Sequence, residues 1–197
     1  SGTPGLSGSP GVSGAQGPAL FTLTTSSPDI TLTSNSAVRT TGTGYNSVYS
    51  VESYPTAFLT GIPANSNLGN QGHMYLTSGG AIYGFYFING NLYYYLGGST
   101  GYVGTYSSSD VLSVIVAASG VSLLVNGTVV QTAAYVSGNY IIDIQLYNTN
   151  EGINNISFGY LSTGISGGPG LSGTPGISGT PGISGTPVSY THLRAHE

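Results

Sequence analysis

Glycine recurs at every third position through two stretches of this chain, residues 2–19 and 164–187. Six glycines keep the phase from Gly2 to Gly17, and eight keep it from Gly164 to Gly185. A flexible Gly/Ser linker has no reason to hold one phase over so many triplets. A strict period of three is required where three extended chains wind around a common axis, because only glycine fits at that axis.

The Gly-x-y pattern, with its frequent proline, therefore predicts collagen-like triple helix in residues 1–19 and 164–187. One such strand buries nothing by itself, so the prediction includes a partner: two further copies of the chain, in a homotrimer. No triplet carries a charge, so ion pairs between chains cannot set their register. We expect the domain between the tracts, residues 20–163, to set it.

The composition excludes several classes of protein. The chain has no cysteine and therefore no disulfide framework. Its formal net charge is −4, and Arg39 is the only Arg or Lys between the tracts, which excludes a nucleic-acid-binding surface. No run reaches the ~18 apolar residues of a membrane span. The roughly 145 residues between the tracts suffice for one domain with its own core.

Short alternating runs rich in Thr, Val, Tyr and Ile fill residues 20–163 and predict strands. Asn89-Gly90 and Asn126-Gly127 each separate two such runs, and Asn-Gly is the strongest short hairpin signal because both turn positions need positive φ. Residues 61–72 (GIPANSNLGNQG) are expected to be a loop. About ten to twelve strands without a helix indicate an all-β sandwich.

The run from Ile82 to Ile88 is apolar on both of its faces. Tyr83, Phe85 and Phe87 alternate with Ile82, Tyr86 and Ile88, as in a strand covered on both sides. A third layer or a neighbouring subunit would provide that cover. An exposed, tyrosine-rich contact face is the other interpretation.

Residues 85–132 resemble the concanavalin-A-like lectin and laminin-G sandwich. The likeness rests on the first hairpin, on the run GYVGTYSSSDVLSVIV (101–116), and on Gly120 to Gly127, which is similar to that superfamily's "dG-x-x-x-x-vNG" hairpin. The resemblance implies an all-β jelly-roll fold. The C1q/TNF-type trimeric jelly roll, which also occurs beside collagen stalks, is the alternative.

The order of triplets, lectin-like domain and triplets again resembles collagen-like proteins of large DNA viruses and of some environmental bacteria. This resemblance implies a non-enzymatic structural or adhesive fibre, extracellular on a virion or cell surface, with the sandwich as trimerisation or attachment domain. Host or surface glycans are the expected partners besides the chain itself. The alternative is a carbohydrate-binding lectin displayed on a collagen-like stalk.

The last ten residues, 188–197 (VSYTHLRAHE), break the triplet phase. They resemble a translated sequencing adapter, so we expect this tail to be non-native and the chain to come from an assembled metagenomic sequence. His192 and His196, four residues apart, are therefore not interpreted as a metal pair. The natural chain is expected to continue in further triplets.

Catalytic patterns are weak between the tracts. The resemblance to lectin-like glucanases implies clustered carboxylates on one strand, and a glycosidase needs two about 5–9 Å apart, whereas YIIDIQLY (140–147) offers only Asp143. Asp143 is interpreted as a surface position of an alternating strand. His73, in NQGHMYL, is interpreted as a plain loop histidine. We expect no enzyme activity and no cofactor.

Several polar and aromatic residues are candidates for binding. Tyrosine rings stack on pyranose faces while amides bond sugar hydroxyls, which makes a sugar platform one interpretation of the many tyrosines, with core packing as the other. Asp110 and Asp29 are weak Ca²⁺ candidates, by the resemblance to sandwiches that hold Ca²⁺ at a loop rim. Asn126 and Asn155 begin N-glycosylation acceptor sequences. The carbohydrate-binding candidates are Tyr93, Tyr95, Tyr102 and Tyr106.

Overall fold

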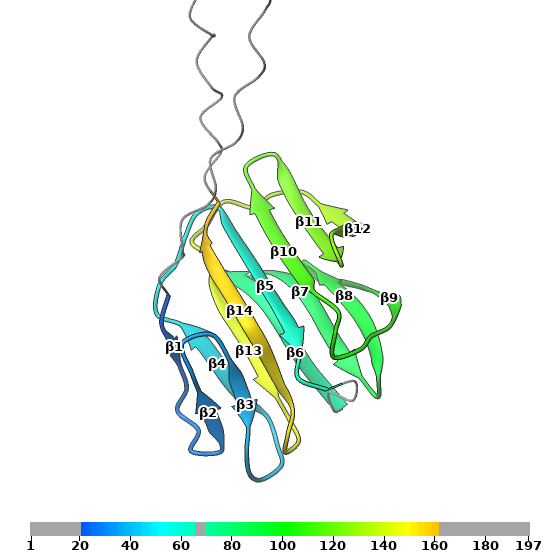
Figure 1. The fold of residues 1–197 in the computed structure, drawn as a ribbon. Coiled ribbons are helices and arrows are strands. Elements are labelled where there is room, and N and C mark those ends of the chain that lie inside the picture. Colours follow the sequence, from blue (N-terminus) through cyan, green and yellow to red (C-terminus); the bar gives the residue numbers. More distant parts are fainter. Residues whose placement is uncertain (1–20, 66–69, 162–197) are drawn as a thin grey trace, which may run out of the picture. The chain divides into compact units, whose positions relative to one another are not determined.

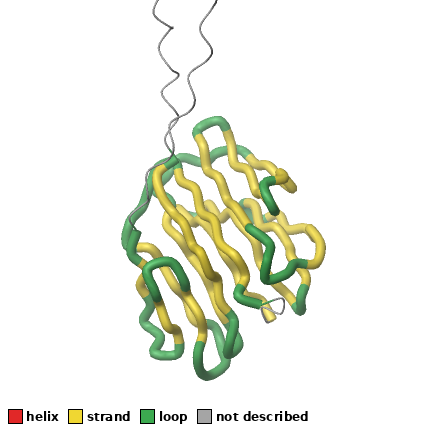
Figure 2. Tube along the Cα trace, viewed as in Figure 1, coloured by secondary structure: helices red, strands yellow, loops and turns green. Residues whose placement is uncertain are grey.

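Two antiparallel sheets of seven strands form the domain (Figure 1). This computed structural model describes residues 21–65 and 70–161, so both Gly-x-y tracts and the tail lie outside the described residues. Those described residues contain strands and loops only (Figure 2). None of them forms a helix that is long and apolar enough to span a membrane.

Strands that are neighbours in space are often distant in the chain. In spatial order, sheet A comprises β1 (Leu23–Thr24), β4 (Asn46–Ser50), β13 (Ile141–Leu146), β6 (Asn70–Ser78), β7 (Ala81–Ile88), β8 (Asn91–Leu96) and β9 (Ser99–Thr105). Sheet B comprises β12 (Thr128–Ala133), β11 (Gly120–Val125), β10 (Leu112–Ala117), β5 (Ala57–Pro63), β14 (Gly152–Tyr160), β3 (Ala37–Arg39) and β2 (Ile30–Leu32). The expected all-β sandwich is confirmed.

The core lies between the sheets and follows the two-residue period of the strands. In β5, β10 and β13 buried and half-buried residues alternate, because successive side chains of a strand point to opposite faces. Leu59, Val114 and Ile142 are among the fully buried residues. Each large apolar side chain buried in this way contributes about 1.5–3 kcal/mol.

Both predicted Asn-Gly hairpins are confirmed. Asn89 and Gly90, between β7 and β8, have φ of 50° and 78°. Asn126 and Gly127, between β11 and β12, have φ of 51° and 77°. Positive φ at both central positions gives a turn whose twist matches that of the flanking strands.

The loop expected over residues 61–72 is wrong at both of its ends. β5 continues to Pro63, which pairs with Ile153 of β14, and β6 already begins at Asn70. Pairing with neighbouring strands supplies the backbone hydrogen bonds there, and it overrides a local composition rich in Gly, Asn and Pro.

Arg39 is the only Arg or Lys among the described residues, and it is buried, with 1% of its surface exposed. Its Nη2 donates to Asp29 Oδ2 at 3.2 Å, and its Nε donates to the carbonyl of Thr41 at 2.9 Å. Nη1 donates to the carbonyls of Gly44 and of Leu146, the last residue of β13. The guanidinium thereby ties the segment between β3 and β4 to sheet A.

Replacing Arg39 with Met is expected to lower the free energy of unfolding by about 3–5 kcal/mol, because it removes the charged partner of Asp29 and a donor to several carbonyls. Urea denaturation measures this. Asp29→Asn serves as the matched partial change: it keeps an acceptor at a site that is 34% exposed, so a smaller loss is expected. Equal stability of Arg39→Met and the parent chain would contradict this role for Arg39.

Candidate functional site

The outward face of sheet A carries two rows of residues that run across six strands. The pairing register sets each row from residues directly opposite one another. The first row is Tyr49, Asp143, Tyr75, Gly84, Tyr95 and Thr100. The second row is Ser47, Gln145, His73, Tyr86, Tyr93 and Tyr102. The residues between them on β4, β13, β6 and β7, such as Met74 and Ile144, are buried in the core, so the rows face away from it.

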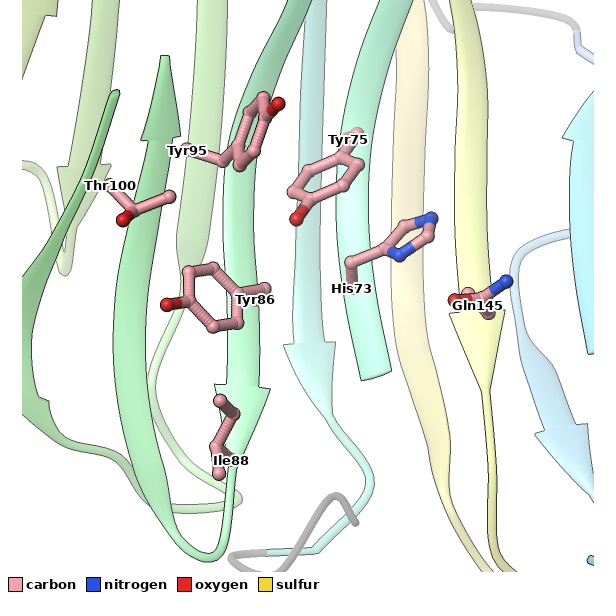
Figure 3. A pocket seen from close by; sticks show the side chains of 7 residues that line it. All are labelled: His73, Tyr75, Tyr86, Ile88, Tyr95, Thr100 and Gln145. Atoms are coloured by element: carbon pink, nitrogen blue, oxygen red, sulfur yellow. The ribbon is translucent and has the colours of Figure 1, made fainter. Parts of the chain in front are cut away.

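A hollow of about 330 Å³ lies where the two rows meet over β13, β6, β7, β8 and β9 (Figure 3). This volume is at the lower end of the range for small-molecule sites. Its lining mixes aromatic rings with uncharged polar groups. The lining residues are His73, Tyr75, Tyr86, Ile88, Tyr95, Thr100 and Gln145.

The aromatic rings of the face pack against one another. His73 and Tyr75 stack with their ring centroids 4.1 Å apart and their planes 7° apart. Tyr86 and Tyr93 stack at 4.9 Å and 19°, and Tyr75 meets Tyr95 at 5.5 Å. Each ring is therefore held in place by a neighbour before any ligand arrives.

The phenol groups of these rings make no hydrogen bonds within the described domain. The hydroxyls of Tyr75, Tyr86, Tyr93 and Tyr95 have no hydrogen-bond partner among the described residues, and no buried side-chain oxygen or nitrogen there lacks one. These hydroxyls are therefore not fully buried. Burial, followed by the neighbouring Tyr95, Tyr86 and Asp143, raises the pKa of Tyr75, so its hydroxyl stays protonated and can donate.

Gly84 makes the contact between Tyr75 and Tyr95 possible. It lies between them in the first row. A Cβ at this position would lie 2.2 Å from the carbonyl oxygen of Met74 and 2.8 Å from Cδ1 of Tyr75. The missing side chain leaves room for the two rings, which lie side by side in Figure 3.

Asp143 is the charged residue of the face, and His73 lies against it. Nε2 of His73 lies 3.1 Å from Oδ1 of Asp143, with the side chains 15% and 22% exposed. Asp143 is on the outward face of β13, as its alternating strand suggested. Its second oxygen has no hydrogen bond to another described residue.

The assignment of His73 to a loop is wrong. His73 lies within β6 and lines the hollow. The polar run before it does not end the strand pattern, because His73 and Tyr75 flank the buried Met74 in the alternation of a strand. Tyr75, Tyr86 and Gln145 are not among the residues that the sequence predicts for a site. Their positions become visible only when β13, β6 and β7 are placed side by side.

The four tyrosines predicted to bind carbohydrate separate into two groups. Tyr93 and Tyr102 are in the second row, and Tyr95 is in the first row, where it lines the hollow. Tyr106 is buried, and its ring contacts Phe87 at 5.0 Å on the core side of sheet A. Tyr106 is therefore a core residue and cannot contact a ligand on the outward face.

The carboxylates of the two weak Ca²⁺ candidates are already engaged by other residues of the domain. Asp110 accepts hydrogen bonds from the Ser107 backbone at 2.7 Å and from Asn126 Nδ2 at 2.7 Å, and the Asn126 bond is the main cause that lowers its pKa. Asp29 pairs with Arg39. Within residues 21–65 and 70–161, no group of three His, Cys, Asp or Glu side chains could hold a metal.

The two possible glycosylation residues lie in different surroundings. The side chain of Asn126 is engaged in its turn, where Oδ1 accepts from the Val111 backbone at 2.9 Å. Asn155 is an exposed residue of β14 with φ of 52°. Neither lies in the two rows.

Asp143 is the only carboxylate in the two rows. The next one along the chain, Glu151, lies outside the rows and is buried, where it accepts hydrogen bonds from the Tyr147 backbone and from Asn148 Nδ2. The paired carboxylates of a glycosidase are therefore not assembled by the described residues of this face.

Solved structures share the fold at low sequence identity. A transglycosylase, Crh5 without ligand, matches 75% of this chain and 80% of its own, with 8% identity and a TM-score of 0.53. The Bacillus licheniformis β-glucanase matches 75% of this chain and 95% of its own, with 10% identity and a TM-score of 0.51. The carbohydrate-binding module CBM66 from Bacillus subtilis matches 70% and 94%, with 11% identity and a TM-score of 0.47.

No protein-family model matches this chain, and the search of curated proteins found no match. The similarity to solved structures shows the fold, a jelly-roll β-sandwich.

Gly84→Ala is expected to lower the free energy of unfolding by about 1–3 kcal/mol and to separate Tyr75 from Tyr95, because the added Cβ has no space. Gly104→Ala is the matched control: its φ of 158° is close to the 156° of Gly84, but no atom lies within 4 Å of its added Cβ. A clearly smaller loss is expected there, because Gly104→Ala carries only the backbone cost of a φ that both glycines share, without the clash of the added Cβ. Equal losses for the two variants in urea denaturation would refute the packing argument.

Proposed function

We propose that this domain binds carbohydrate on the outward face of sheet A. The hollow between the two rows carries the proposal, because it combines ring surfaces with hydroxyl and amide groups that have no partner within the described domain. A sugar presents apolar C–H faces and a rim of hydroxyls, and it therefore needs this combination.

The chemistry of each lining group supports the proposal. Tyr86 and Tyr95 offer apolar ring surface for the C–H face of a pyranose. The amide of Gln145 and the hydroxyl of Thr100 can donate to and accept from sugar hydroxyls. Asp143 does not line the hollow but stands next to Tyr75 in the first row, and its carboxylate adds an acceptor for charge-assisted hydrogen bonds, which are stronger than neutral ones.

The named structural neighbours lend further support. A transglycosylase, a β-glucanase and a carbohydrate-binding module are named in those matches. A shared fold does not transfer function by itself. The argument for this chain therefore rests on its own lining residues.

Binding without turnover is the proposed activity. Glycosidases use two carboxyl groups on either side of the scissile bond, whereas Asp143 alone supplies one to this face. His73 is held by Asp143 and by the Tyr75 ring, which suits a fixed binding group.

The setting proposed for the domain is a homotrimeric, extracellular fibre on a virion or cell surface, with the Gly-x-y tracts as stalks. Phe21 and Phe158, which lie near the two ends of the described chain, pack with their ring centroids 6.2 Å apart. Three copies on one stalk would multiply weak sugar contacts through avidity.

Tyr86→Ala is expected to weaken binding to a recognised polysaccharide by about tenfold or more, because it removes ring surface from the hollow. Affinity electrophoresis of the full chain in gels that contain laminarin, xylan, mannan or hydroxyethylcellulose measures this. Tyr160→Ala removes an equally large ring that is 49% exposed on β14 of sheet B, so binding should be unchanged. Equal loss in both variants would place the binding site elsewhere, and no binding to any glycan of a broad array would reject the proposed function.

Light scattering is expected to give three times the monomer mass for the full chain and the monomer mass for residues 20–163 alone. The reason is that Tyr86 and Ile88, on the outward face of β7, line the proposed sugar site, which a neighbouring subunit packed on that face would block. A trimer formed by residues 20–163 would show that the sandwich itself holds the three chains together.

A further inference from the structure

We infer that the ligand of this face is an uncharged linear polysaccharide, and that Asp143 selects against acidic glycans. This inference rests on the proposed function, which it narrows to one class of ligand. It concerns the charge and the length of the ligand, and both follow from the two rows.

Asp143 places a negative charge within the binding face. In the first row it stands between Tyr49 and Tyr75, with 22% of its side chain exposed. His73 engages Oδ1, and Oδ2 has no partner among the described residues. A uronate or sulfate group bound beside Asp143 would meet a like charge, which is a strong means of rejecting a wrong partner.

The described domain has no free cation that could offset this repulsion. Its only Arg or Lys is Arg39, which is buried and engaged by Asp29 and backbone carbonyls. Its only histidine, His73, faces Asp143 itself. The described residues include five carboxylates against one arginine, a net charge of 1 − 5 = −4 with histidine neutral. The field around the domain therefore also opposes the approach of an anion. The five carboxylates are Asp29, Glu52, Asp110, Asp143 and Glu151.

The remaining groups of the face suit hydroxyl groups. Tyr75 keeps its proton and can donate, while Gln145 and Thr100 can both donate and accept. Asp143 Oδ2 is an acceptor for one or two sugar hydroxyls. None of these interactions requires a charge on the ligand, so a neutral sugar satisfies the face more fully than an acidic one.

The length of the rows indicates a chain rather than a single sugar. Six adjacent strands contribute to each row, and at about 4.8 Å between strands the rows extend over about 24 Å. Tyr49 begins the first row with 41% of its surface exposed, and Tyr102 ends the second with 60% exposed. Neither end is closed by a bulky buried side chain, so an inner segment of a linear polysaccharide can lie along the face.

The test compares neutral and acidic forms of one polysaccharide backbone, hydroxyethylcellulose with carboxymethylcellulose and xylan with glucuronoxylan. The full chain is measured by affinity electrophoresis at about pH 8, above the range in which histidine normally titrates. At least about tenfold stronger binding to the neutral member of a recognised pair is expected. Asp143→Asn, which keeps the shape of the side chain, should reduce this preference to about threefold or less by strengthening binding to the acidic member.

A second variant separates the local charge from the net charge. Glu52→Gln removes one charge from the domain and keeps an acceptor for the Thr22 backbone N–H, which Glu52 Oε2 binds at 2.7 Å. The preference should persist in Glu52→Gln. Loss of the preference for the neutral polysaccharide in Glu52→Gln would overturn the role of Asp143. Persistence of that preference in both Asp143→Asn and a second neutral variant, Asp143→Ser, would overturn it as well.

The remaining outcomes distinguish this inference from the proposed function. If the parent chain binds the acidic member as well as or better than the neutral one, and Tyr86→Ala abolishes that binding, the proposed function stands and the inference is overturned. If no glycan binds at all, the proposed function fails, and the inference fails with it.

Discussion

The register of the antiparallel strands in sheet A is the constraint on which both the core and the candidate site depend. Along β6, Met74 and Leu76 point into the core, while His73 and Tyr75 point outward. A slip of one residue would exchange these two sets. Two features fix the register. The buried set excludes water from the core, and the short Asn89-Gly90 turn aligns β7 with β8. The site is therefore the outer surface of the same pairing that forms the core.

Arg39 extends this dependence to the edge of the sheet. A domain with one buried cation and few charges relies on that cation to satisfy several backbone carbonyls at once. The carbonyl of Leu146 ends β13, the strand that carries Asp143 and Gln145. The contact therefore secures the end of a strand whose outward residues enter both rows. Buried polar groups that are fully satisfied favour one arrangement over its alternatives, and in this domain that arrangement includes the position of the site.

The sequence predicted the layers of the fold better than it predicted the site. Both hairpins and the strand character of β10, β13 and β14 follow from local alternation and turn residues, whereas β7 is apolar on both faces and its sequence does not show which face meets the core. The rest depends on contacts between distant segments. His73 joins the site because β6 pairs with β13, about seventy residues further along the chain, and Tyr106 is buried because Phe87 of another strand covers it. No local pattern distinguishes Tyr106 from Tyr102, since both follow glycine-rich runs.

The stacking of the aromatic rings links the packing of the face to its proposed affinity. Rings that already contact one another lose little rotamer freedom when a ligand binds, which reduces the cost of binding. The same contacts use part of each ring surface, since Tyr86 faces Tyr93 and His73 faces Tyr75. Less ring surface then remains for a sugar than on an open platform, and a hollow of about 330 Å³ admits only a short part of a chain at a time. A single domain of this kind should bind rapidly and weakly, so three copies on one stalk would provide the affinity that one face lacks.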